Sequence, residues 1–406
     1  MQVRKAALAF IFVTVVIDVL ALGIVIPVLP KLVVAFEGGD TARAADTFGI
    51  FMAVWGLMQF VCMPLVGAIS DHFGRRPVIL LSCFGLGCDY FLMAWAPSLA
   101  WLLVGRIISG ATASSFSTSF AYIADVAPPD KRAQYFGYVG AAFGLGFVLG
   151  PAFGGILGNV DPRLPFKVAG VMALLAAAYG YFILPESLAP GRREKFEWKK
   201  ANPVGSLVLL RSHPELAGLS VSYFLMQLAH VALPSVAVLY MGYRYGWDTL
   251  QVGFVLAGVG ICSMIVQGAL IKPLVSKLGE RRSLALGLLF GVIGFAIYGI
   301  ASTGLLFLIG VPVMALWGFA TPSLQALMTR HVSGSEQGKL QGANASMTAI
   351  AGLIGPMIFA TAFSYFIAAD APVQLPGAPY LLAAAILLAS CAIAWHVTRT
   401  EERRTT

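Results

Sequence analysis

The chain has 406 residues, of which 58% are hydrophobic and only 11% charged, and its formal net charge is +8. Soluble domains carry about 25% charged residues, so this composition excludes an ordinary soluble domain, and the high hydrophobicity excludes a disordered chain. The apolar runs are continuous rather than alternating, which excludes an outer-membrane barrel and favours membrane-spanning helices.

Twelve apolar segments follow one another along the chain. Each is long enough to cross about 30 Å of hydrocarbon at 1.5 Å per residue. They cover residues 6–30, 46–68, 77–96, 98–122, 136–158, 165–185, 215–241, 250–272, 282–302, 303–327, 338–365 and 378–397. We therefore predict an all-α integral membrane protein with twelve transmembrane helices.

The basic residues predict the orientation of these spans. On the side that holds both termini lie 21 of the 27 Lys and Arg residues, and five lie on the opposite side. The positive-inside rule then places both termini in the cytoplasm of a multi-pass protein, in the inner membrane if the source is bacterial. Topology accounts for the positive net charge, so no nucleic-acid partner is expected.

The longest polar stretch divides the chain into two groups of six spans. We predict an N-terminal six-helix bundle over residues 1–185, a cytoplasmic linker over 186–214 and a C-terminal six-helix bundle over 215–406.

The two halves repeat each other at an offset of 205 residues. Gly74 aligns with Gly279, and Gly150-Pro151 aligns with Gly355-Pro356. Two six-span halves repeated in parallel are typical of transporters with a central site. The same offset aligns Asp125 with Arg330, which makes an ion pair between the halves conceivable.

Several motifs resemble those of the major facilitator superfamily. The loop after the second span reads GAISDHFGRRP at 67–77, the fourth span carries GRIISG at 105–110, and the fifth carries GFVLGPAFGG at 146–155. The last resembles the antiporter motif of drug exporters in that superfamily. The run DVLALGIVIPVLP at 18–30 and the pair Asp89-Tyr90 resemble the tetracycline/proton antiporters.

This resemblance covers essentially the whole chain and implies proton-coupled efflux of tetracycline-like or other hydrophobic, drug-like compounds by alternating access. The implied partners are that small substrate, tetracycline with a divalent cation being one candidate, together with protons and the lipid bilayer. Two alternatives remain: a facilitator that moves a metabolite by uniport or symport, and a membrane receptor or scaffold that does not transport.

Three charged residues fall deep within predicted spans of the first half, where a charge costs at least about 2.5–3.5 kcal/mol. They are Asp18, Asp89 and Arg106. A carboxyl group in a low-dielectric cavity can exchange a proton in a useful pH range, so Asp18 is the first candidate proton carrier and Asp89 the second. We expect Arg106 to be the counter-ion of Asp18, or a fixed positive charge that tunes the pKa of Asp18. One alternative is a permanent Asp18–Arg106 ion pair that locks two helices together. For Asp89 the alternative is a carboxylate at the lipid interface or one that caps a helix.

A second group of residues is predicted to control opening of the cytoplasmic face. A carboxylate here can interact with a helix N-terminus or an arginine, and a glycine permits the tight turn. The alternatives are topology alone for the charged residues and packing alone for the glycines and proline. The predicted gating residues are Asp71, Gly74, Arg75, Arg76, Asp125, Arg132, Gly150, Pro151 and Gly154.

Polar residues within otherwise apolar spans are candidates for substrate contact, because drug sites are apolar with a few polar groups that fix orientation. These are Gln59, Gln227, His230, Gln267 and Asn344, although a lone histidine can also be a hydrogen-bonded packing residue. The chain departs from well-known tetracycline exporters at Ser263, where they have histidine, and at Gly291, where they have aspartate.

No enzymatic chemistry is expected. The five cysteines form no CxxC pair and no Cys/His cluster, and the sequence has no phosphate-binding loop or hydrolase motif. We therefore predict no cofactor, no bound metal and no catalytic residue.

Overall fold

The computed structural model is helical almost throughout, and no strand occurs in the part of the chain that it describes. That part is residues 2–405 apart from 114, 129–130, 190, 192, 194–195, 197–201, 203–204, 214–215 and 334–335.

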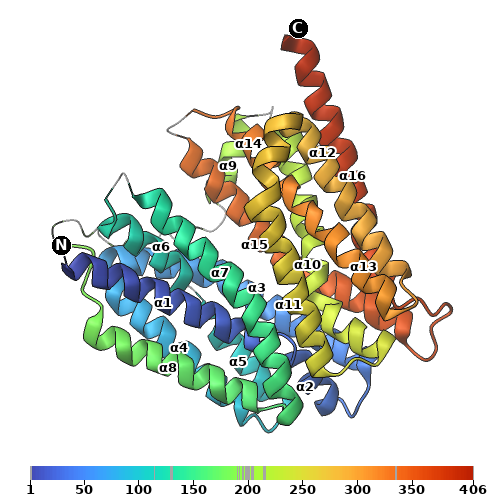
Figure 1. The fold of residues 1–406 in the computed structure, drawn as a ribbon, viewed down its shortest axis with the longest axis horizontal. Helices are drawn as coiled ribbons and strands as arrows, with labels where there is room; N and C mark the ends of the chain where they lie inside the picture. The colour runs from blue at the N-terminus through green and yellow to red at the C-terminus, as the bar shows by residue number, and fades with distance from the viewer. Residues whose placement is uncertain are drawn as a thin grey trace. The chain divides into compact units, whose positions relative to one another are not determined.

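The described residues before position 186 form eight helices: α1 (Gln2–Val25), α2 (Leu29–Phe36), α3 (Thr41–Phe73), α4 (Arg75–Ala94), α5 (Leu99–Thr112), α6 (Ser115–Val126), α7 (Arg132–Val160) and α8 (Leu164–Ile183). The short α9 (Val208–Ser212) is followed by α10 (Ala217–Tyr245), α11 (Thr249–Ile265), α12 (Ile271–Ile300), α13 (Gly304–Ala315), α14 (Ala320–Thr329), α15 (Gln337–Ile367) and α16 (Ala378–Thr405) (Figure 1). A π-helical segment, Val266–Leu270, joins α11 to α12, and a 3-10 turn, Leu316–Phe319, joins α13 to α14.

Ten helical segments of the described residues are long and apolar enough to cross a membrane. The number is below twelve for two reasons. Thr249–Ile300 is a single segment of 52 residues, although Gly279 within it has a non-helical backbone. At 1.5 Å per residue it would be about 78 Å long, enough for two crossings of the hydrocarbon. The predicted fourth span is divided between α5 and α6, which are each shorter than one crossing.

The helices form two compact units. The first comprises Met1–Gly38, Val54–Pro203 and Asp248–Ala257, and the second comprises Gly39–Ala53, Val204–Trp247 and Gly258–Thr406. Helices α3 and α11 each contribute residues to both units. The boundaries of the two six-helix bundles, which we place at residues 185 and 215 from the sequence, stay a prediction.

The same packing pattern occurs in both units. In the first unit α1 packs on α7 and α8, while α4 packs on α5, α6 and α8. In the second unit α10 packs on α15 and α16, while α12 packs on α13, α14 and α16. An offset of 205 residues relates these helices in order, so the repeat in the sequence is also a repeat of helix packing.

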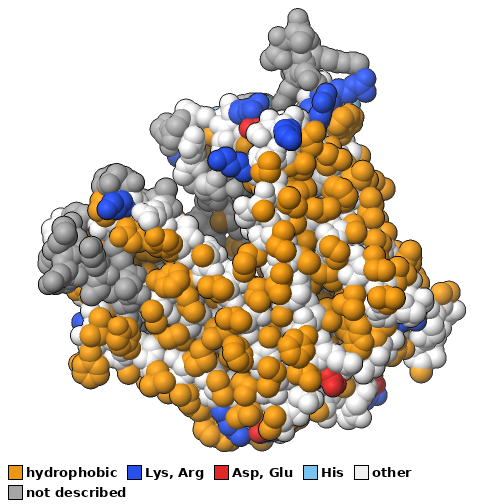
Figure 2. Space-filling model, in the orientation of Figure 1, with side chains coloured by type: hydrophobic (Ala, Val, Ile, Leu, Met, Phe, Trp, Pro, Cys, Tyr) orange, Lys and Arg blue, Asp and Glu red, His pale blue; other side chains and the backbone are white. Residues whose placement is uncertain are grey.

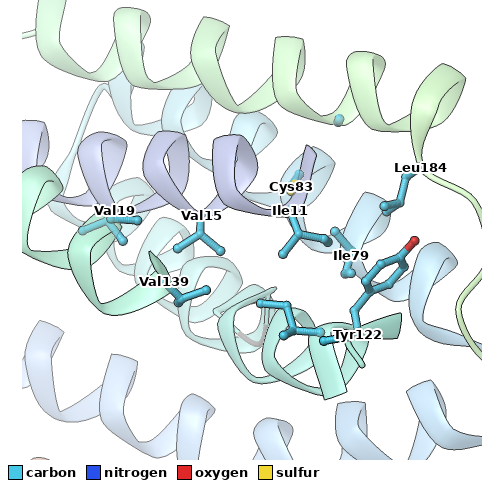
Figure 3. Close-up of a cluster of buried hydrophobic side chains, with 12 residues drawn as sticks. Ile11, Val15, Val19, Ile79, Cys83, Tyr122, Val139 and Leu184 are labelled. Atoms are coloured by element: carbon cyan, nitrogen blue, oxygen red, sulfur yellow. The ribbon is translucent and has the colours of Figure 1, made fainter. Parts of the chain in front are cut away.

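A cluster of buried hydrophobic side chains holds the first unit together. Ile11, Val15 and Val19 recur every four residues and therefore lie on one face of α1. Figure 3 shows Ile11 close to Ile79 of α4, with Val15 and Val19 following along α1, and Tyr122 of α6 belongs to the same cluster. Lipid tails are as apolar as these side chains, so the cluster stabilises the unit by close packing rather than by removal from water.

Large hydrophobic side chains also lie on the outside of the helices. Phe182 and Leu175 on α8 and Leu305 on α13 are all more than half exposed. In Figure 2 hydrophobic side chains cover most of the face shown, and few charged side chains interrupt them. An apolar exterior of this kind is suited to lipid and not to water.

Glycines let α1 and α7 touch through their backbones. A Cβ atom at Gly150 would lie 2.6 Å from the Cα of Gly23, and one at Gly154 would lie closer still to the carbonyl oxygen of Ile24. Small residues permit such an approach between membrane helices. Gly150, Pro151 and Gly154, all predicted as gating residues, lie at this crossing within the first unit.

We predict that Gly150→Ala lowers the thermal stability of the protein, because the new methyl group would meet the backbone of α1. Overpacking of this kind costs about 1–3 kcal/mol. The matched control is Gly140→Ala in the same helix, where a Cβ atom would meet nothing within 4 Å. Thermal unfolding of the purified protein in detergent measures both variants, and equal midpoints for the two would contradict the prediction.

Candidate functional site

Among the described residues of the first unit, three acidic or basic side chains are buried: Asp18 on α1, Asp89 on α4 and Arg106 on α5. Each is at most 5% exposed, although each carries a group that ionises in water. All three were predicted from the sequence as proton-coupling residues. Burial of these groups costs more free energy than burial of the neutral side chains around them.

Arg106 lies against Asp89. Its Nη2 atom is 4.0 Å from Oδ2 of Asp89 and also donates a hydrogen bond of 3.3 Å to the sulfur of Met93. We expected Arg106 to be the counter-ion of Asp18, but its ion pair in the structure is with Asp89. The reason is the packing of α4 on α5, in which the side chain of Asp89 also lies where a Cβ atom of Gly105 would be.

Asp18 belongs to the same electrostatic neighbourhood. The residues on either side of it, Val15 and Val19, pack in one buried cluster with Ile79 and Cys83 of α4. The structure thus gathers the three predicted residues around α4. They can hold one positive and up to two negative charges in a small volume, so adding or removing a proton there changes the balance of charge.

The second unit has no such set at the related positions. The offset of 205 residues relates Asp18 to Tyr223, Asp89 to Gly294 and Arg106 to Val311. The packing of the helices is repeated, but the charges are not.

A second site surrounds the turn between α3 and α4. Gly74 has a φ of 111°, a conformation that favours glycine, and it ends α3 so that α4 can begin at Arg75. The side chain of Arg75 binds Asp71 through Nη1, and its Nε atom lies 3.2 Å from Oδ2 of Asp125 on α6. The predicted residues Asp71, Gly74, Arg75 and Asp125 are therefore in one cluster.

Glu186 is part of this cluster and was not predicted from the sequence. Its carboxylate accepts hydrogen bonds from the backbone N–H groups of Arg75 (2.9 Å) and Arg76 (3.2 Å), the first residues of α4. A negative charge at a helix N-terminus satisfies free N–H groups and interacts favourably with the helix dipole. The signal in the sequence was an isolated acidic residue directly after the sixth apolar segment.

Neighbouring contacts fix the chain after α8 to this cluster. Ser187 donates a hydrogen bond of 3.1 Å to Asp125, and Tyr122 donates one of 2.9 Å to the carbonyl of Pro185. Arg76 donates to the carbonyl of Tyr181 at 2.7 Å. Arg132 is the first residue of α7, but its side chain lies outside the described part of the structure.

Two of the predicted substrate-contacting residues lie on α10 in the second unit. Gln227 donates a hydrogen bond of 3.1 Å to the hydroxyl of Thr348 on α15, which is also 3.3 Å from the hydroxyl of Tyr223. His230 is exposed, and its ring centroid lies 5.5 Å from that of Trp317. Helix α10 thus presents an amide and an imidazole next to an aromatic ring.

The other three belong to other elements. Gln267 is exposed and belongs to the π-helical segment, a geometry that often marks functional positions. Asn344 is buried on α15, and its side-chain amide has no hydrogen-bond partner among the described residues. Gln59 lies half-buried on α3, in the first unit.

Glu186 is expected to stabilise α4. We predict that Glu186→Ala lowers the free energy of unfolding by about 0.5–2 kcal/mol, the range for loss of a helix-capping side chain, and that Glu186→Gln loses less. Asp370→Asn, which changes an exposed carboxylate, is the control and should leave stability unchanged. Midpoints of thermal unfolding measure the three variants. A Glu186→Ala protein as stable as this control would show that the cap contributes nothing.

For the buried pair Asp89–Arg106 we predict that the two single variants lose unequal amounts of stability. Asp89→Asn leaves a buried cation that cannot lose its proton, so we expect a cost of about 3–5 kcal/mol. Arg106→Gln should cost less, because an isolated Asp89 can take up a proton and become neutral. The double variant should be more stable than Asp89→Asn alone. Unfolding midpoints at one pH decide this, and equal losses in the two single variants would count against the pair.

Comparison with known proteins agrees with this architecture. The sequence matches the Major Facilitator Superfamily over residues 11–356 and 219–406. It is 35% identical to the class C tetracycline resistance protein of Escherichia coli over 352 residues, which is 87% of this chain and 88% of that protein. Identity to the class B protein of Escherichia coli is 33% over 351 residues, 86% of each chain.

Solved structures show the same fold. A mutant of the nucleoside transporter NupG has a TM-score of 0.80 at 11% identity, with 96% of this chain and 99% of that chain covered. The human organic anion transporter MFSD10 has a TM-score of 0.70 at 24% identity, with the same coverage. The chain is a multi-pass integral membrane protein that belongs to the Major Facilitator Superfamily and, within it, to the group of tetracycline resistance proteins.

Proposed function

We propose that this protein exports tetracycline-like or other hydrophobic, drug-like molecules in exchange for protons, by alternating access. The observation that carries the proposal is the set of buried ionisable residues in the first unit, Asp18, Asp89 and Arg106. A membrane protein that does not move protons would be more stable without these charges. The substrate class rests on the similarity to tetracycline resistance proteins.

Protonation of Asp89 would release Arg106 from its ion pair. The two groups are held 4.0 Å apart without a closer hydrogen bond between them, so the pair is weaker than a bidentate one. Loss of the negative charge removes the attraction and changes which helix arrangement is favoured. Asp18 acts on the same part of α4 and supplies a second carboxyl group for the same exchange.

Gly291 supports a proton path through the first unit. The resemblance implies an aspartate at this position, but a Cβ atom there would meet Leu387 and lie 2.9 Å from the ring of Trp317. Leu387 and Trp317 would therefore have to shift before an acidic side chain could be accommodated at this position. In this protein the carboxyl groups of the first unit carry the exchange alone.

Substrate would be oriented by the polar groups of the second unit. Gln227 and His230 lie on α10 with Trp317 nearby, which provides hydrogen-bonding groups beside an aromatic surface. Gln267 and Asn344 of the same unit and Gln59 of the first unit are the further candidates. The functional halves are residues 1–185 and 215–406, joined by the linker 186–214.

The cluster around Gly74 would act on the cytoplasmic face. Arg75 joins the start of α4 to the end of α6 through Asp125, with Asp71 as a further partner of its guanidinium. Breaking these ion pairs would free the ends of α3, α4 and α6 from one another. This group of contacts is the part of the protein that opens during transport.

The test is uptake of tetracycline with magnesium into everted membrane vesicles whose interior is made more acidic than the medium. We expect uptake that a protonophore abolishes. Asp18→Asn and Asp89→Asn should lose most of this gradient-driven uptake at equal protein level, while Asp370→Asn keeps it. Undiminished uptake by both aspartate variants would refute the proton path. No uptake by the folded parent protein would reject tetracycline as substrate.

A further inference from the structure

The second unit contains its own glycine turn with an ion pair beside it. Gly279 has φ 76° and ψ 165°, close to the φ of 111° and ψ of 164° at Gly74. The residue after it, Glu280, places its Oε2 atom 2.6 Å from Nη2 of Arg330, which directly follows α14. This pair is not part of the site described above.

The offset of 205 residues relates this pair to Arg75 and Asp125, with the charges exchanged. Position 75 holds the arginine in the first unit, and position 280 holds the glutamate in the second. The following arginine is anchored on an aromatic ring in both units. Its guanidinium carbon lies 5.7 Å from the ring centroid of Tyr181 for Arg76. The corresponding distance from Arg281 to Trp395 is 4.6 Å.

The exchange of charges matters because both pairs lie at helix ends. Helix N-termini favour negative charge and C-termini favour positive charge. Glu280 begins the helical stretch after Gly279, and Arg330 caps the end of α14, so both have the favourable sign. Arg75 begins α4 and Asp125 lies in the last turn of α6, so both have the unfavourable sign.

The first unit compensates for this with Glu186, whose carboxylate caps α4 next to Arg75. The pair Glu280–Arg330 does not depend on such help, since each residue would be stabilised at its helix end even without the other. The two ion pairs therefore differ in how readily they separate: helix dipoles oppose the first pair and support the second.

We propose that Glu280 and Arg330 are positioning residues whose ion pair is a permanent clasp. It keeps the start of the helix after Gly279 attached to the end of α14 throughout the transport cycle, in contrast to the Arg75–Asp125 pair. The proposal rests on the proposed transport function, because it concerns the transport cycle. The ion pair itself can be tested without any substrate.

The first measurement is a double-mutant cycle on thermal unfolding with Glu280→Gln, Arg330→Gln and the double variant. Because Arg330 is 65% exposed, we expect each single change to lower the midpoint by only about 1–3 °C. The double variant should lose less than the sum. Arg282→Gln, which changes an exposed arginine two residues after Glu280, is the control. Additive losses, or single variants that match this control, would show that there is no clasp.

The second measurement distinguishes a permanent clasp from a gate. Glu280→Cys and Arg330→Cys are combined in a chain whose native cysteines are replaced by serine, and the two thiols are bridged with a short bifunctional reagent. Gradient-driven uptake by the bridged protein should stay within about twofold of the unbridged protein. If bridging stops uptake, the pair must open during transport and the proposal is wrong. Failure of the transport proposal itself would appear instead as no uptake before bridging.

Discussion

The structure depends on how charge is accommodated where water is absent. Asp89 and Arg106 lose their hydration when α4 packs on α5, and their mutual attraction only partly restores it. A carboxyl group can escape this cost by taking up a proton, and a guanidinium group cannot. The pair is therefore stable in one protonation state and strained in the other, which is the property that a proton-driven transporter requires.

The two units share the same helix packing but differ in the charged residues that they contain. Both use related pairs of helices, and both place a glycine with positive φ before a charged residue at a helix start. Only the first unit buries Asp18, Asp89 and Arg106, while the second has Tyr223, Gly294 and Val311 in their place. In the mechanism that we propose, the first unit is thus the one that exchanges protons. The other has Gln227 and the exposed His230 on α10 beside the ring of Trp317, together with an ion pair whose charges have the favourable sign at their helix ends.

Much of this was predictable from the sequence because lipid imposes a simple rule on it. Long apolar runs predict membrane-spanning helices, and a charged residue within such a run is costly to insert. Asp18, Asp89 and Arg106 could therefore be predicted as functional residues. The partner of Arg106 was not predictable, since it depends on how α4 and α5 are rotated against each other. Glu186 was missed because we took it for the first residue of a linker. Its side chain accepts a hydrogen bond from the backbone N–H of Arg75, which lies 111 positions earlier in the chain. The alignment of Asp125 with Arg330 suggested a pair between the halves, but each residue has a partner within its own unit.

The central claim is that substrate moves in exchange for protons held by the buried carboxyl groups. The most direct measurement uses purified protein in liposomes that contain a pH-sensitive dye and have no imposed gradient. Addition of tetracycline with magnesium outside should make the interior more alkaline as substrate enters and protons leave, and Asp89→Asn should abolish the signal. Substrate entry with no change of internal pH would contradict the account.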